Sequence, residues 1–408
     1  FAAASGGGGL SSDAQKNTVG GTNAGDSFTG TDANNNTLIG YNAGTAITTG
    51  DGNTILGIDA GESITSGLTN VCIGRRAGRN ITTANTLTYV GPFCGHDTTT
   101  AASNTGMGQG ALYNCTTGSY NSAFGDLSLY GVTTGDKNVG IGYQAGSAIT
   151  TGRQNCALGY ETMNQAEAAN TDFSVAIGRR AFQYGGGGAD ECVAVGYQAL
   201  QGTSSNSAAN YNTGVGAYAL YQYTTATYNS AFGKNAGAAV TTGSNNCLLG
   251  YQAGRSQSPS GNITTGSNNV VIGDNNITNF YCADTSISSS DQRDKTDVTS
   301  FTIGLNWIEA LRPVTYRWDR RTWYGTDDEP YGTPDGSKKK QRLHIGFLAQ
   351  EALAVEQANG YGTNNDDSLI LNLTDDGMSY GMKYERLVPI LVNAIKELST
   401  RVQALEAG

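Results

Sequence analysis

Apolar residues recur along residues 17–279 at a step of 17 residues, a spacing that fits neither a helix nor an ordinary globular domain. Counting from Gly40, seven further glycines follow at that step without a slip, and the pattern continues to Gly273 with small insertions. An apolar residue always precedes the glycine, and a small or β-branched residue stands two positions before that one. This alternation is typical of a short strand, and about 15 such copies predict a β-solenoid with one copy per turn.

Particular positions of the repeat carry predictions about its interior. We expect the two alternating residues, such as Thr37 and Ile39, to point inward. The residue between them is often Gly or Ala, as at Ala123, which suits close contact between neighbouring solenoids or a tightly packed strand. Asn stands four residues before the glycine in 11 of 14 copies and predicts a hydrogen-bonded ladder. The frequent Ala three residues after the glycine, as at Ala43, predicts a narrow interior.

Other structures fit this repeat poorly. Its content of Gly, Thr and Asn disfavours helices, and disordered low-complexity chains do not keep an apolar position in every copy. Tyr recurs directly after the repeat glycine, for example at Tyr143 and Tyr160. Such a row of rings predicts either a sugar-binding surface or ring stacking along the shaft.

From residue 290 the composition changes to that of a small α/β domain. The last 119 residues hold 14 of the 24 Lys and Arg, 18 of the 34 Asp and Glu, but only 10 of the 58 Gly. We therefore expect a flexible lead-in over residues 1–16, a shaft over 17–279, a linker over 280–289 and a separate domain over 290–408.

The pattern of this domain predicts three helices and two strands. A helix is expected over residues 302–311, stopped by Pro313 and followed by a strand, and residues 343–358 fit a strand that runs into a helix. The chain ends in an amphipathic helix whose apolar residues recur at spacings of three and four, which predicts a coiled coil with copies of itself. The expected seam consists of Leu387, Leu391, Ala394, Leu398, Val402 and Leu405.

Charge and cysteine content disfavour several function classes. A net charge of -10 argues against a nucleic-acid partner, and no apolar run approaches the roughly 18 residues that span a bilayer. The seven cysteines form no CxxC and no Cys/His cluster, so we expect buried fillers, no metal site and no cofactor. Carboxylates are never paired at a recurring position, which disfavours a glycan hydrolase, although the insertions near Gly185 and Ser204 leave room for one.

Two resemblances add to this interpretation. The stretches NSAFGKNAG (229–237) and SVAIGRRAF (174–182) resemble the repeats in the heads of trimeric surface adhesins of the YadA type. That resemblance covers most of residues 17–273 and implies a left-handed parallel β-roll in each chain, with three chains side by side.

The domain resembles the self-cleaving intramolecular chaperones of phage tailspikes and fibres, the peptidase S74 family. The resemblance rests on SDQRDK (290–295), LRPVTYRW (311–318), HIGFLAQE (344–351) and a terminal YERLVPILVNAIKEL helix (384–398). It implies a domain that trimerises, templates the folding of the fibre before it and cuts itself off.

The family's nucleophile and base correspond to Ser290 and Lys295, and Asp291 and Arg293 match the flanking motif. His344 opens a matched segment, but no chemical role is carried over to it. A serine hydroxyl needs a nearby base, and a neutral lysine can serve once burial lowers its pKa. The expected cut lies between Ser289 and Ser290, with a cut after Ser290 as a variant.

Together these features predict a mostly β, homotrimeric fibre or spike protein of a virion, or an otherwise extracellular one. We expect it to bind a host-cell receptor or glycan and to contact a phage tail or baseplate protein. Its only expected enzymatic activity is one autocatalytic serine–lysine cut. A non-viral extracellular adhesin or filament and a tailspike glycan hydrolase are the alternatives.

Overall fold

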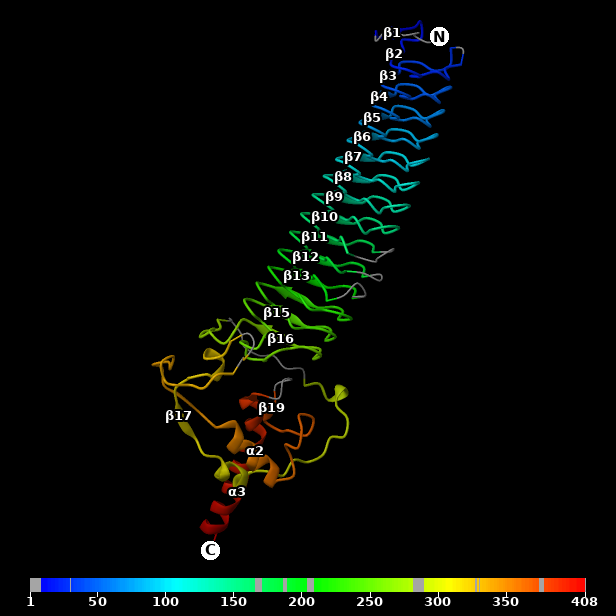
Figure 1. Ribbon diagram of the computed structural model, residues 1–408. Coiled ribbons are helices and arrows are strands. Elements are labelled where there is room, and N and C mark those ends of the chain that lie inside the picture. Colours follow the sequence, from blue (N-terminus) through cyan, green and yellow to red (C-terminus); the bar gives the residue numbers. More distant parts are fainter. Residues whose placement is uncertain are drawn as a thin grey trace. The chain divides into compact units, whose positions relative to one another are not determined.

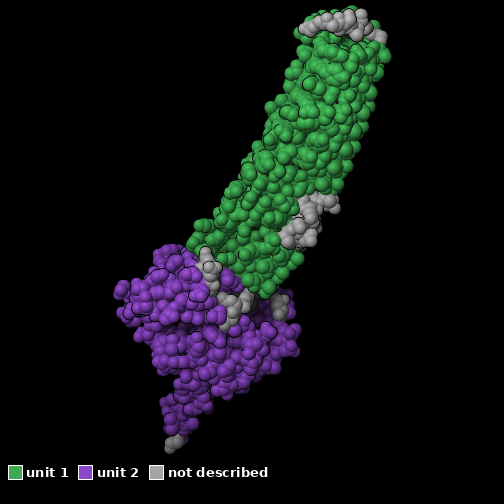
Figure 2. All heavy atoms as spheres, in the orientation of Figure 1, with its two compact units in different colours: residues 1–255, 263–273 green, residues 256–262, 274–408 purple. Residues whose placement is uncertain are grey.

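The computed structural model describes residues 9–29, 31–165, 171–185, 189–203, 209–281, 290–326, 329, 331–373 and 378–407. The chain forms two compact units, which Figure 2 colours separately. The shaft comprises residues 1–255 and 263–273, and the C-terminal domain comprises residues 256–262 and 274–408.

The shaft is a β-solenoid in which strands β2 to β16 pair in parallel, each with the strand of the next turn (Figure 1). Equivalent repeat positions lie opposite one another, as Thr37 does with Thr54. Strand β1 pairs antiparallel with β2, so regular structure begins inside the segment expected to be a lead-in. The strands are β1 (Ser11–Ser12), β2 (Thr18–Gly20), β3 (Thr37–Ile39), β4 (Thr54–Leu56), β5 (Val71–Ile73), β6 (Thr88–Val90), β7 (Thr105–Met107), β8 (Ser122–Phe124), β9 (Val139–Ile141), β10 (Cys156–Leu158), β11 (Val175–Ile177), β12 (Val193–Val195), β13 (Thr213–Val215), β14 (Ser230–Phe232), β15 (Cys247–Leu249) and β16 (Val270–Ile272).

The predicted facing of these strands was wrong. The middle residue of each strand points inward and is fully buried at Leu38, Ile55 and Ala123, whereas the residue before the glycine points outward. Alternation identifies two faces but not which of them is covered, and the small middle residues reflect the narrow interior. In nine turns the residue directly before the glycine is 36–47 % exposed. These residues form what we call the stripe: Leu56, Met107, Phe124, Ile141, Leu158, Ile177, Phe232, Leu249 and Ile272.

The predicted asparagine ladder is confirmed. Asn53 donates through its backbone N–H and its Nδ2 to Asn36 Oδ1, at 2.9 and 3.0 Å, and through Nδ2 to Gly67 O at 2.9 Å. All three groups are buried, so each bond satisfies a polar atom that water cannot reach. The Ala three residues after the glycine is buried as expected, for example at Ala43 and Ala60.

Each turn bends at corners that need unusual backbone conformations. The repeat glycine is one of them: Gly57 has φ 140°, and a Cβ there would lie 2.5 Å from the carbonyl oxygen of Gly74. Two further corners place non-glycine residues in the left-handed region, such as Asn35 at φ 57° and Asn42 at φ 53°. Asn tolerates this region better than most residues, which helps to explain its frequency at these corners.

Side chains on the outer surface stack along the shaft. The rings of Tyr143 and Tyr160 stack at 5.3 Å, and Arg179 lies over Tyr160 and Tyr197 at 5.7 and 5.8 Å. The six cysteines in the described part are free thiols: four are buried as expected, and the other two, Cys156 and Cys247, are half-buried on the outward face.

The C-terminal domain joins short strands and helices around a small core. β17 pairs antiparallel with β18, and β19 with β20. The core contains Trp307, Leu311, Ala352, Ile370, Leu371, Leu387 and Ile390. The elements are η1 (Gln292–Asp294), α1 (Leu305–Ala310), β17 (Val314–Tyr316), η2 (Arg321–Trp323), β18 (His344–Gly346), α2 (Ala349–Ala358), β19 (Leu371–Leu373), β20 (Tyr380–Met382), η3 (Tyr384–Arg386) and α3 (Leu387–Glu406).

The expected helices and strands of this domain are present, with α1 beginning three residues later than predicted because Gly304 precedes it. The β19–β20 hairpin was not predicted. Among the described residues, no helix combines the length and apolarity needed to cross a bilayer.

Candidate active site

A single helical turn brings the predicted nucleophile and base together. Lys295 Nζ lies 2.6 Å from Ser290 Oγ and 3.2 Å from the carbonyl oxygen of Ser290. Between them the chain forms the 3₁₀ turn η1, which closes with a hydrogen bond from the Lys295 N–H to Gln292 O at 3.2 Å. The turn therefore folds the motif back on itself, so that residues five apart in sequence come into hydrogen-bonding contact.

The flanking residues Asp291 and Arg293 hold this turn. The Asp291 carboxylate caps the turn by accepting the Arg293 N–H at 2.9 Å, and it also accepts the Arg293 guanidinium at 2.6 Å. The hydrogen bond from the Arg293 side chain lowers the pKa of Asp291 and raises the pKa of Arg293. Both side chains are exposed, so their role is to fix local conformation rather than to stabilise the domain as a whole.

The pair Ser290–Lys295 can serve as nucleophile and base only when the lysine amine is neutral. In the single chain both side chains are exposed to solvent, and the Lys295 amine donates a hydrogen bond to the Ser290 hydroxyl oxygen. Ser289, which carries the carbonyl of the expected cut, lies outside the described residues.

His344 occupies a different environment from Ser290 and Lys295. It pairs with Tyr316 across β17 and β18, and its ring stacks on that of Tyr316 at 5.6 Å and meets Trp318 edge-on at 6.3 Å. These contacts make it a member of an aromatic cluster. In the described part of the chain, no hydrogen bond joins it to the serine or the lysine.

The terminal helix α3 divides the expected seam between two faces. Leu387 and Ala394 are buried within the chain itself, where the helix packs on α1. A different set is 42–83 % exposed and follows an unbroken a/d heptad pattern, which we call the seam: Val388, Leu391, Ile395, Leu398, Val402 and Leu405. Val388 and Ile395 were missed, although their spacing of three and four from the leucines is visible in the sequence.

In the parts of the chain that are described, no group of three or more His, Cys, Asp or Glu side chains could hold a metal ion. Three features have clear chemical or assembly potential: the Ser290–Lys295 pair, the stripe and the seam. The first suggests acyl chemistry, and the other two are apolar surfaces of the kind that contact other chains.

Comparison with known proteins finds a family similarity in part of the second unit. Residues 290–361 match the model of the peptidase S74 family, described as chaperone of endosialidase, and the match begins at Ser290. No curated protein and no solved structure matches the chain. A match to this chaperone family that follows a β-solenoid is a combination that fits a tail fibre or tailspike with a chaperone domain.

Proposed function

We propose that this protein is the subunit of a homotrimeric viral fibre or spike whose C-terminal domain assembles three chains and then cuts itself from the shaft. The observation that carries the proposal is the Ser290–Lys295 contact of 2.6 Å at the first residue of the family match. A cut before Ser290 would release the matched domain with its nucleophile as the new first residue.

The apolar surfaces support assembly. The seam leaves six large apolar side chains in water on one helix, and the stripe adds nine along the shaft. Covering such surfaces is favourable at about 25 cal/mol per Å² of apolar area, and three parallel copies would cover the same residues of each chain.

The proposed cleavage proceeds through an ester. Ser290 Oγ attacks the carbonyl carbon of Ser289 while the neutral amine of Lys295 takes the hydroxyl proton. The peptide C–N bond breaks, and that proton passes to the freed α-amino group of Ser290. Water then hydrolyses the ester, which leaves a carboxylate on Ser289 and restores the Ser290 hydroxyl. One water molecule is consumed for one peptide bond.

Assembly is proposed to switch this chemistry on. A lysine becomes a base when it loses solvent or gains a neighbouring cation. In the single chain Lys295 is exposed, and the adjacent cation, Arg293, is paired with Asp291. Burial of the motif between chains would supply the missing desolvation, so the cut would follow trimerisation.

The test compares the wild-type chain with Ser290→Ala, Lys295→Met and the matched control Ser300→Ala, an exposed serine ten residues on. Gels run with and without boiling, together with intact mass, should give a fragment of residues 290–408 from the wild type and the control only. Both active-site variants should remain full-length trimers. A full-length wild-type chain, or a cut in Ser290→Ala, would exclude the proposed mechanism.

Host attachment is the remaining part of the proposal, and it assigns receptor or glycan contact to the shaft surface. Exposed aromatic rings such as Tyr143 and Tyr160 support it, because aromatic faces pack well against sugar rings. Fluorescently labelled trimer should bind the surface of host bacteria, and replacing both tyrosines with serine should weaken that binding. Unchanged binding would move the receptor site elsewhere on the chain.

A further inference from the structure

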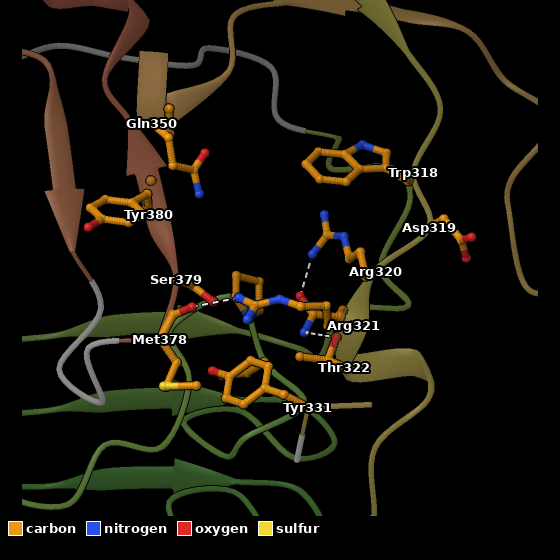
Figure 3. Close-up of a pocket in the computed structure, with 15 residues that line it drawn as sticks. Trp318, Asp319, Arg320, Arg321, Thr322, Tyr331, Gln350, Met378, Ser379 and Tyr380 are labelled. Atoms are coloured by element: carbon orange, nitrogen blue, oxygen red, sulfur yellow. Dashed lines mark hydrogen bonds between the residues drawn. The ribbon is translucent and has the colours of Figure 1, made fainter. Parts of the chain in front are cut away.

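A polar cavity of about 450 Å³ lies in the C-terminal domain, well apart in sequence from Ser290 and Lys295. Its volume falls within the roughly 300–1,000 Å³ of small-molecule sites. Figure 3 shows its lining, with Arg320 and Trp318 on one side, Gln350 and Tyr380 on the other, and Arg321 extending between them. Nothing in the proposed cleavage uses these residues.

Two arginines in this cavity have no acidic partner in the part of the chain that the structure describes. Neither Arg320 nor Arg321 forms an ion pair with a carboxylate among the residues that the structure describes. Arg320 Nε is buried and has no acceptor. Burial lowers the pKa of Arg320, as expected for a cation that has lost part of its hydration without gaining an anion.

Other contacts hold both guanidinium groups in place. Arg320 lies 4.2 Å above the Trp318 ring and donates to Asn275 Oδ1, while Asn275 in turn donates to Thr322 Oγ1 at 2.9 Å. Arg321 donates to Met378 O at 2.6 Å and lies 4.8 Å above the ring of Tyr331. The two positive charges are therefore fixed before any ligand arrives, which reduces the entropy lost on binding.

The start of helix α2 adds to the positive potential. Ala349 and Gln350, the first two residues of this ten-residue helix, line the cavity, and the helix has no side-chain cap. Uncapped N–H groups at a helix start favour a negative group. Asp319 also lines the cavity, but it accepts the Tyr324 hydroxyl at 2.7 Å, and a single carboxylate leaves two arginines with an excess of positive charge.

We propose that this cavity binds a carboxylated sugar, with the carboxylate between Arg320 and Arg321. A planar guanidinium matches a carboxylate well. The remaining lining fits a sugar ring: Gln350 and Thr322 can hydrogen-bond to hydroxyl groups, and the half-exposed ring of Tyr380 offers a face for stacking.

The experiment is titration calorimetry with glucuronate, glucose and inorganic phosphate on the full chain carrying Ser290→Ala, so that the domain stays attached whatever the outcome for self-cleavage. We expect saturable binding of glucuronate, and at least tenfold weaker binding of glucose and of phosphate. Arg320→Gln should weaken glucuronate at least tenfold. Arg317→Gln, an exposed arginine outside the cavity, should bind like the parent chain.

Arg321→Gln serves as a second variant if melting curves show that Arg320→Gln does not fold. No saturable binding of glucuronate, or equal binding in a folded arginine variant, would overturn the proposal. Phosphate that binds as tightly as glucuronate would show a general oxyanion site and would overturn the assignment to a sugar. None of these outcomes bears on self-cleavage, which is tested separately.

Discussion

The shaft and the C-terminal domain solve the problem of folding in opposite ways. In the shaft the turns repeat the same contacts: one inward residue per strand, one glycine against the next and, in most turns, one asparagine bonded to the next. The domain has a unique core around Trp307, assembled from residues far apart in sequence. Repetition makes the shaft easy to extend, but it also makes its turns nearly interchangeable.

This difference bears on how three chains would align. Stripes of equivalent residues could pair in several registers that differ by one turn of about 4.8 Å. The domain has no such ambiguity, and its seam provides a fixed end. The seam itself has β-branched residues at a and Leu at d, a combination that favours two strands in isolated coiled coils. In the proposed assembly the seam therefore defines the register of the chains, and the number of chains must come from the surfaces around it.

Substitutions that remove the seam are expected to have the largest effect on assembly. The double change Ile395→Asp and Leu398→Asp would place six like charges at the centre of three packed helices. We expect complete loss of the trimer in size-exclusion chromatography with light scattering. Because the proposed cut depends on assembly, no fragment of residues 290–408 should form.

The matched control is Thr400→Asp, which adds a charge to the same helix on the side away from the seam. It should leave both trimer and cleavage intact. Efficient cleavage by a monomeric double variant would separate self-cutting from assembly and contradict the proposed switch.

A second test asks whether the stripe contributes as well. Phe124→Asp places a charge on the stripe, and a desolvated, unpaired charge there would cost on the order of 3 kcal/mol per chain. We expect a lower melting temperature and a smaller trimer fraction. Tyr120→Asp, in the same turn but off the stripe at 61 % exposure, should change neither. Equal melting of the two variants would mean that the stripe stays exposed to solvent.

The period of the repeat was sufficient to predict the solenoid, its turn length and its asparagine ladder. It could not predict which strand face is inside, because Thr37 and Leu38 alternate equally well in either orientation. Nor could it predict which groups replace the hydrogen bonds of asparagine in the turns that lack it. Where Cys192 replaces the asparagine, its thiol takes over the hydrogen bond to the backbone by donating to Ala209 O at 3.2 Å. Where Leu87 replaces it, the nearby Tyr89 places a buried hydroxyl 2.9 Å from the hydroxyl of Thr98.

The sequence predicted the residues of the candidate site but not their exposure to solvent in the single chain. The motif located Ser290 and Lys295, and the 3₁₀ turn accounts for their contact. Their exposure in one chain is a property of the fold around them, which local sequence does not encode. The cavity at Arg320 was missed because it joins residues from widely separated segments, and no spacing relates Asn275, Arg320 and Gln350.

The asparagine ladder offers a smaller effect, confined to the shaft. Asn121→Ala would remove the acceptor of Asn138 N–H and Nδ2, at 2.9 and 3.1 Å, and the donor to Gly135 O at 2.9 Å. Each buried group left without a partner costs about 1–3 kcal/mol. We expect a clearly lower denaturant midpoint for the shaft, with the seam still trimeric.

Asn80→Ala is the control for that change, because Asn80 is only half-buried and its Nδ2 bonds to Asp97 at 3.1 Å near the surface. It should shift the free energy of unfolding by no more than about 0.5 kcal/mol. Similar midpoints for the two variants would mean that water replaces the lost amide inside the shaft.

The smallest expected effect is a difference in cysteine labelling. It distinguishes the inner face of the shaft from the outer face and involves no change in stability. Burial raises the pKa of Cys72 and Cys192 to about 12, so at pH 8 both stay neutral thiols that iodoacetamide does not reach. Cys156 and Cys247 stand on the outward face beside the stripe. Mass spectrometry should find Cys72 and Cys192 unlabelled in the trimer and in the seam variant alike, which also verifies that the variant's shaft is folded. The two outward cysteines should label faster in the seam variant than in the trimer, since only assembly covers that face. Equal labelling of these two in both forms would place the chain contacts on another side of the solenoid.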